Sequence, residues 1–201
     1  MIENLINFVR SRTFIYSVSG VVLLFGVLSL VNYLNDQKNQ EEFLQFVEIN
    51  EEFSNEAETA EDLFKRLDLE YQNFGYELIT KSVLAKKALD EESFELALEI
   101  YLDINKQLKS SSIANATKNV LKEQYAENIV RLQIELDRYD DGKLFLEQTN
   151  LKSPRFYELG GDFYKSFGEN ELANQWYDKA LDSDLNETQK NLIELKKPFD
   201  E

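Results

Sequence analysis

Hydrophobic positions divide this chain into two parts. Residues 14–34 form a run of 21 residues without a charge, whereas later apolar residues recur three and four positions apart among polar ones. A helix rises about 1.5 Å per residue, so the first run matches the hydrocarbon core of a bilayer, about 30 Å thick. The second pattern is typical of amphipathic helices. The sequence therefore predicts an all-α protein, with a single N-terminal transmembrane helix followed by an α-solenoid.

The amphipathic part is divided by short polar turns. Turns are predicted at 90–93 and at 139–142, and Asn186 with Gln189 resembles a capping box that opens the last helix. Pro154 favours a helix start, and Pro198 a helix end. The helices predicted are 40–53, one through Leu63 and Tyr71, 75–90, 94–108, a long one through Tyr125 to Leu136, 143–148, 154–167, 170–182 and a last one before Pro198.

Small and aromatic residues define a repeated helix pair. A tetratricopeptide repeat carries aromatic, small and aromatic residues on its first helix, and small, aromatic and small residues on its second. Small residues let the two helices approach closely, and aromatic rings fill the space beside them. Earlier pairs fit in part, with Gly142 at the small position of the middle one. The last pair fits throughout, with Tyr157, Gly161, Tyr164, Ala173, Tyr177 and Ala180.

Charges around the apolar run predict its orientation. Arg10 and Arg12 precede it, whereas acidic residues dominate the segment that follows. Because positive charge stays on the cytoplasmic side, we expect the N-terminus inside and residues 36–201 outside. A cleavable signal peptide is the alternative, but no small-x-small cleavage site follows the run. Small residues in the run predict a face that packs against another membrane helix, formed by Ser19, Gly20, Gly26 and Ser29.

Composition narrows the function. The chain has 38 acidic and 22 basic residues, and setting aside Glu3, Arg10 and Arg12 leaves 37 and 20 on the exported part. The negative electrostatic field of this excess of acidic residues repels nucleic acid. The chain contains no Cys or His, which excludes thiol catalysis, Ser-His triads and the usual zinc sites. We expect no enzyme activity, no cofactor and no metal; Glu127, Glu158 and Asp162 are weak acid–base candidates because chance proximity is expected among so many carboxylates.

The concave face of the predicted solenoid is the candidate binding surface. In stacked repeats the first helix of each pair lines this face. Its mixture of charges and a few apolar side chains suits an extended segment of a partner protein, although an ordinary solvated surface explains it equally well. The residues predicted there are Ser82, Lys86 and Leu89, then Glu127, Arg131 and Ile134, then Glu158, Asp162 and Lys165.

This layout resembles the ancillary SecYEG translocon subunit family (YfgM-type) of the Gram-negative inner membrane. The resemblance covers a cytoplasmic segment at 1–13, the span 14–34, a membrane-proximal helix pair at 35–74 and a repeat domain at 75–201. It includes LAKKALDEESFELALEIYLDI and GGDFYKSFGENELANQWYDKAL. The composition departs from the family in being unusually acidic and poorer in alanine.

The resemblance implies a function at the bacterial inner membrane. It implies a periplasmic tetratricopeptide-like domain that associates with the SecYEG translocon, with a membrane-anchored parvulin-like chaperone and with nascent or translocated polypeptides. The alternatives are a scaffold for cell-envelope or division machinery without a translocon role, and a hydrolase with an unrecognised site.

Overall fold

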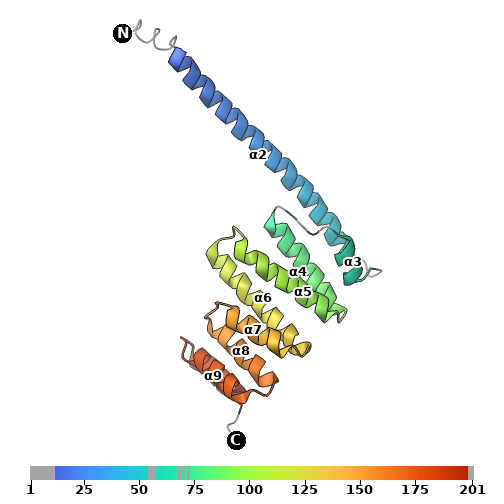
Figure 1. The fold of residues 1–201 in the computed structure, drawn as a ribbon, viewed down its shortest axis with the longest axis vertical. Helices are drawn as coiled ribbons and strands as arrows, with labels where there is room; N and C mark the ends of the chain where they lie inside the picture. Colours follow the sequence, from blue (N-terminus) through green and yellow to red (C-terminus); the bar gives the residue numbers. More distant parts are fainter. Residues whose placement is uncertain (1–11, 54–57, 68, 70, 72, 199–201) are drawn as a thin grey trace.

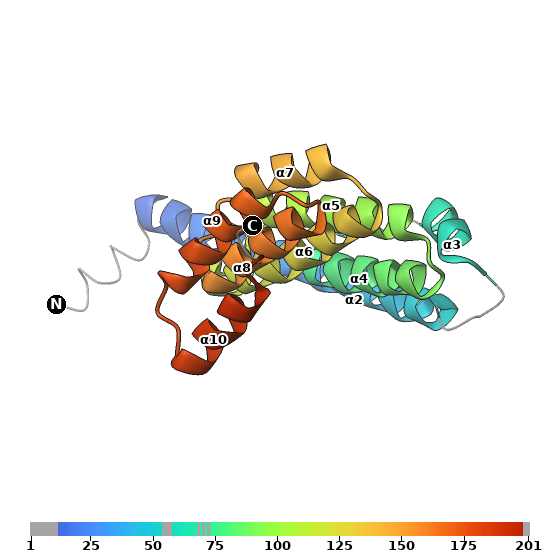
Figure 2. The ribbon, with the colours of Figure 1, turned by 90° about the horizontal axis from the view of Figure 1, so that it is seen from below.

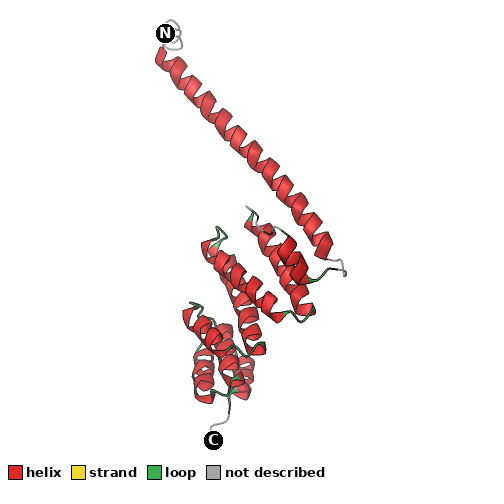
Figure 3. Ribbon diagram, turned by 45° about the vertical axis from the view of Figure 1, so that its right-hand side comes forward, coloured by secondary structure: helices red, strands yellow, loops and turns green. Residues whose placement is uncertain are grey.

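Helices make up the regular structure of the chain. The computed structural model describes residues 12–53, 58–67, 69, 71 and 73–198, with side chains from Ser29 onward. No strand occurs in these residues (Figure 3). The helices are α2 (Arg12–Phe53), α3 (Ala60–Arg66), α4 (Phe74–Asp90), α5 (Phe94–Ser110), α6 (Asn115–Glu135), α7 (Tyr139–Gln148), α8 (Pro154–Ser166), α9 (Asn170–Leu181) and α10 (Glu187–Lys196).

α2 is one continuous helix of 42 residues, where the pattern predicts a span at 14–34 and a separate helix at 40–53. The linking residues 35–39 include no Pro or Gly, so nothing interrupts the backbone ladder. Figure 1 shows the N-terminal part of α2 extending away from the other helices. At its other end, Ile49 and Phe53 are buried in a core shared with α4.

No helix is, over its described residues, both long and apolar enough to cross a membrane. Most of the predicted span lies where the side chains are outside the described residues, so the span stays a prediction.

Three helix pairs stack along the long axis of the molecule, as α4–α5, α6–α7 and α8–α9 (Figure 1). The first helices of the pairs and α10 lie toward one side, and α5 and α7 lie toward the other (Figure 2). This arrangement confirms the predicted stack of helix pairs.

α6 lies between two hydrophobic clusters and contributes to both. Tyr125, Ile129 and Leu132 pack with α2, α4 and α5, whereas Ala126 and Val130 pack with α7, α8 and α9. The central helix therefore joins the two halves of the array because it is apolar on two faces.

Glycines allow the closest helix approaches. A Cβ atom added at Gly161 would lie 2.5 Å from the Tyr177 ring, and one at Gly142 would lie 2.2 Å from the Phe163 ring. Gly160 stands equally close to Trp176. The packing role predicted for Gly161, and the small position predicted at Gly142, are therefore confirmed.

Two predicted boundaries are wrong. Residues 139–142 form the first turn of α7, where a turn was predicted; the chain reverses at Leu136–Arg138, with Asp137 at φ 55°. Acidic residues stabilise a helix N-terminus, and Gly142 is needed for close packing. Because acidic residues and glycine are also common in turns, the sequence pattern wrongly predicted a turn here. α3 ends at Arg66, and Tyr71 is buried outside any helix.

The predicted helix ends elsewhere agree with the structure. Asn186 and Gln189 form both hydrogen bonds of a capping box, and Pro154 occupies the first turn of α8. The turn before α5 is also confirmed, with Glu92 at φ 58°. These ends fix the orientation of the helices that position the candidate site.

One buried ion pair lies between α4 and α5. The Lys81 ammonium donates to Glu77 at 2.5 Å and to Asp103 at 2.6 Å, and Lys81 and Glu77 are each 7% exposed. Burial alone would lower the pKa of Lys81, but the hydrogen bonds to Asp103 and Glu77 outweigh it, so the pKa is raised. Lys81 therefore stays charged between the two helices.

Candidate partner-binding face

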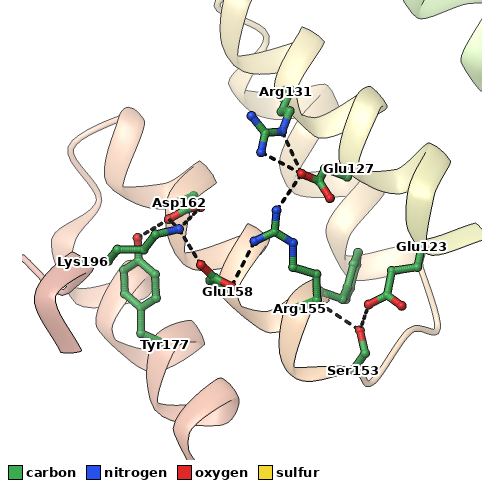
Figure 4. Close-up of polar contacts among 10 residues, drawn as sticks. Glu123, Glu127, Arg131, Ser153, Arg155, Glu158, Asp162, Tyr177 and Lys196 are labelled. Atoms are coloured by element: carbon green, nitrogen blue, oxygen red, sulfur yellow. Dashed lines mark hydrogen bonds and ion pairs between the residues drawn. The ribbon is translucent and has the colours of Figure 1, made fainter. Parts of the chain in front are cut away.

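The inner face is the surface formed by the exposed sides of α4, α6 and α8, and it carries the residues predicted for partner binding. Glu127 and Arg131 lie one turn apart on α6, and Glu158 and Asp162 lie one turn apart on α8. Because α6 packs directly on α8, the two pairs come together in one polar cluster (Figure 4).

Arg155 connects α6 to α8 within this cluster. Its guanidinium donates to Glu127 at 2.7 Å and to Glu158 at 3.1 Å. Arg131 donates to the same Glu127 oxygen at 2.7 Å. Ser153 caps α8 through the Phe156 amide and donates to Glu123 of α6. The first turn of α8 is therefore attached to α6 by charge-assisted hydrogen bonds.

Lys196 of α10 extends the cluster across α8. Its ammonium lies 2.6 Å from Glu158 and 2.8 Å from Asp162. Asp162 also accepts a hydrogen bond of 2.7 Å from the Tyr177 hydroxyl of α9. The last helix therefore folds back over α8, and its cation occupies the inner face beside two residues predicted to bind a partner.

The neighbouring cations shift the pKa of Glu127. Burial would raise the pKa of this carboxyl, but hydrogen bonds from Arg155 and Arg131 outweigh burial and lower it. Glu127 therefore stays ionised, and because its lowered pKa makes it a weaker base, it does not suit general-base catalysis.

Burial and Asp162 act in the same direction on Tyr177. Both raise the pKa of the phenol, because each disfavours its ionised form. For Lys196, burial lowers the pKa and the hydrogen bonds to Asp162 and Glu158 raise it, with the net shift upward. The cluster therefore holds a neutral phenol donor and a charged ammonium on either side of Asp162.

The other residues predicted to bind a partner already make contacts within the chain. Lys86 is exposed and pairs with Asp90 on its own helix at 2.9 Å. Leu89 and Ile134 are half-buried and pack against the two hydrophobic clusters. Lys165 donates to the backbone carbonyl of Lys196. The structure thus joins only part of the predicted set into one surface.

Ser82 and the predicted core aromatics serve packing. The Ser82 hydroxyl lies 2.7 Å from the Tyr125 hydroxyl, which connects α4 to α6. Of the aromatic side chains in the last repeat, Tyr164 and Tyr177 are buried, whereas Tyr157 and Trp176 are half-buried. Of the small residues predicted to pack in the membrane, Ser19, Gly20 and Gly26 lie outside the described side chains, and Ser29 is exposed.

Sequence reasoning missed Arg155 and Lys196, although they connect the cluster. Arg155 carries one local signal, since Glu158 follows at a helical spacing of three residues. No local sequence signal indicates the role of Lys196, because nothing in the pattern shows that α10 returns to α8. Among the described residues, no group of three or more acidic, His or Cys side chains is arranged to hold a metal ion.

Stacked helix pairs joined by short turns, with glycine or alanine at the closest approaches, define the class of the protein: an α-solenoid of helix–turn–helix repeats. The chain belongs to the tetratricopeptide repeat-like domain family, whose model matches residues 11–198. No curated protein and no solved structure matches the chain. Tetratricopeptide-like domains are generally non-catalytic scaffolds for protein–protein interaction, which suggests a scaffold role for the chain.

Proposed function

We propose that this protein is a scaffold anchored in the bacterial inner membrane by residues 14–34. Its repeat domain lies in the periplasm, associates with the SecYEG translocon and connects it to a membrane-anchored parvulin-like chaperone that handles translocated polypeptides. One observation carries the proposal: a single family model extends from residue 11 to residue 198 and so includes both the uncharged run and the repeats.

The charge distribution supports the proposed arrangement. Arg10 and Arg12 flank the run on one side, and the strongly acidic repeat domain follows on the other. Arg131 and Lys86 are exposed on the inner face, and although each pairs with a carboxylate of its own helix, they offer contacts to a partner segment with acidic side chains. The continuous α2 holds the repeats at a distance from its N-terminal end, since a helix of 42 residues is about 63 Å long.

Site-specific photocrosslinking in intact membranes tests the proposal. The crosslinking residue is placed at Ser19, Gly26 or Arg131, with Glu147 on α7 as the control position. We expect channel subunits to be captured from positions 19 and 26, and the chaperone or a translocated chain from position 131. Capture of only lipid and envelope-assembly or division proteins would contradict the translocon role and favour the alternative scaffold.

Exchange of residues 14–34 for an unrelated apolar span provides the second test. If the run docks on the channel, the exchanged protein remains in the membrane but no longer co-purifies with SecYEG in mild detergent. Unchanged co-purification would show that the contact lies elsewhere in the chain.

A further inference from the structure

A groove of about 790 Å³ lies between α3, the N-terminal half of α5 and the turn that joins α6 to α7. We call it the α3–α5 groove. Its lining residues come from α3, α5 and the two turns that precede α5 and α7, and Figure 2 shows α3 and α5 lying away from α10. None of the residues discussed for the inner face lines it.

The floor of the α3–α5 groove is apolar. Phe94, Leu98 and Leu102 follow one another at intervals of four on α5, so they form a stripe along the same side of that helix. Phe64 of α3 and Leu136 also line the groove. Phe94 is half-buried, Leu98 is 2% exposed and Leu102 is 38% exposed, so the stripe is most open at Leu102.

The rim of the groove is acidic and incompletely neutralised. Four carboxylates and two cations line it: Glu61, Glu92, Glu95, Glu99, Lys65 and Arg138. Lys65 pairs with Glu61 at 2.6 Å, and Arg138 pairs with Glu95. Neither Glu92 nor Glu99 makes a salt bridge with a residue that the structure describes.

The unpaired carboxylates extend from ordered backbone. Glu95 and Glu99 lie one turn apart on α5, where like charges repel, and Arg138 compensates for only the first. Glu92 has φ 58°, and its amide donates to the Leu89 carbonyl at 3.1 Å, so the tight turn before α5 fixes its backbone. A cation from outside the chain would therefore meet two exposed carboxylates that are carried by ordered backbone.

We propose that the α3–α5 groove binds a short amphipathic basic segment of a partner polypeptide. The segment places apolar side chains against Phe94 and Leu102 of the stripe, and Lys or Arg side chains beside Glu92 and Glu99. The stripe spans about 12 Å along α5, which accommodates about two turns of helix carrying apolar side chains one turn apart. This proposal is independent of SecYEG and of the inner face.

Binding of a synthetic peptide to the full chain tests the proposal. The protein is inserted in nanodiscs of zwitterionic lipid, with empty nanodiscs as the blank, and the probe is a fluorescent peptide of about twelve residues with two Leu one helical turn apart and flanking Lys. A peptide of the same composition with the Leu residues on opposite faces is the control. We expect saturable binding of the first peptide, measured by fluorescence anisotropy, and at least about tenfold weaker binding of the second.

Matched variants separate groove binding from attraction to the net negative charge. Glu99→Lys and Leu102→Gln are expected to weaken binding of the peptide about tenfold each. Glu147→Lys and Leu144→Gln place the same changes on exposed positions of α7 and should alter binding less than about twofold. Equal losses at positions 99 and 147 would overturn the proposal, as would equal binding of the two peptides or no binding at all.

One further outcome identifies a different occupant. The chain in detergent, without nanodiscs, is also tested for dimer formation. If it dimerises and Leu102→Gln abolishes the dimer, the groove holds a second copy of the chain. The assignment to a partner segment is then wrong. Circular dichroism of each variant shows that its helices remain folded. These results do not depend on whether the translocon crosslinks are found.

Discussion

At the scale of single residues, close contact and paired charge explain why particular side chains stand where they do. Gly161 is a glycine because the Tyr177 ring lies where its Cβ would be, and the Tyr177 hydroxyl is bound to Asp162. The ring is fully buried, so it has little room to move away. Packing, rather than backbone conformation, requires the small residue.

Gly161→Ala should lower the free energy of unfolding by about 1–3 kcal/mol, since a methyl group in a filled core forces the rings and helices apart. Urea unfolding followed by circular dichroism measures the change. Gly75→Ala is the control, because Gly75 is exposed and an added Cβ meets only the Asn73 side chain, at 3.1 Å. Equal stability of the two variants would disprove the packing role.

Lys81→Met should destabilise the protein by about 3 kcal/mol, because it leaves the Glu77 carboxylate buried without its cation. The double variant Glu77→Leu with Lys81→Met should recover most of that loss, since apolar side chains can replace a buried ion pair. Chemical denaturation of the wild type and both variants gives the comparison. A double variant as unstable as Lys81→Met would show that the charge is needed for another reason.

At the scale of elements, salt bridges position helices relative to one another. Glu127 lies between two arginines, of which Arg155 belongs to α8, and α10 returns to α8 through Lys196. These contacts are partly exposed, so each contributes little on its own. Their effect is to fix the neighbouring helices.

Stability should depend on the Glu127 carboxylate in a defined pH range. Its pKa is lowered in the folded protein, so its contribution is present above the unfolded value near pH 4 and is lost as the pH falls through the folded value. Glu127→Gln should cost about 1 kcal/mol at pH 7, and the difference from wild type should shrink below about pH 4. Thermal melts at several pH values measure it. A difference that stays constant down to pH 3 would contradict the ion-pair explanation.

Lys196→Ala should loosen α10 without unfolding the array, because it removes the ammonium that contacts Glu158 and Asp162. Amide hydrogen exchange in α10 should become about fivefold faster, with the exchange of α6 unchanged. Lys190→Ala is the control on the same helix, since Lys190 makes no ion pair with a described residue. If both variants accelerate exchange equally, the loosening reflects helix propensity and not the contact.

At the scale of the whole molecule, a long N-terminal helix and a stack of repeats present two surfaces, the inner face and the α3–α5 groove. The stack is held by α6, which packs in both hydrophobic clusters. An α-solenoid of this kind is extended because each pair contacts only its neighbours. Its two sides are therefore available to different partners.

The proposed orientation predicts a labelling pattern. The chain has no cysteine, so single cysteines can be introduced without a background signal. An impermeant thiol reagent applied to cells with a permeabilised outer membrane should label Asp184→Cys but not Asn4→Cys, and both should react after lysis. Labelling of position 4 alone would reverse the proposed topology.

The sequence by itself determined the helices, most of their ends and the repeated pair. Periodicity and caps depend on residues a few positions apart, which is why Pro154 and the Asn186 capping box were sufficient to place helix starts. The same local rules misplaced the turn at 139–142, because Asp-Asp-Gly suits both a turn and the first turn of a helix.

Only the tertiary structure decided which charges meet. Lys196 and Asp162 are 34 residues apart in the chain, and Arg155 reaches Glu127 on another helix. The α3–α5 groove likewise depends on where α3 ends and how the α6–α7 turn packs. Local patterns determine whether a helix forms, whereas contacts between helices depend on how every pair stacks, and that packing is a property of the whole array.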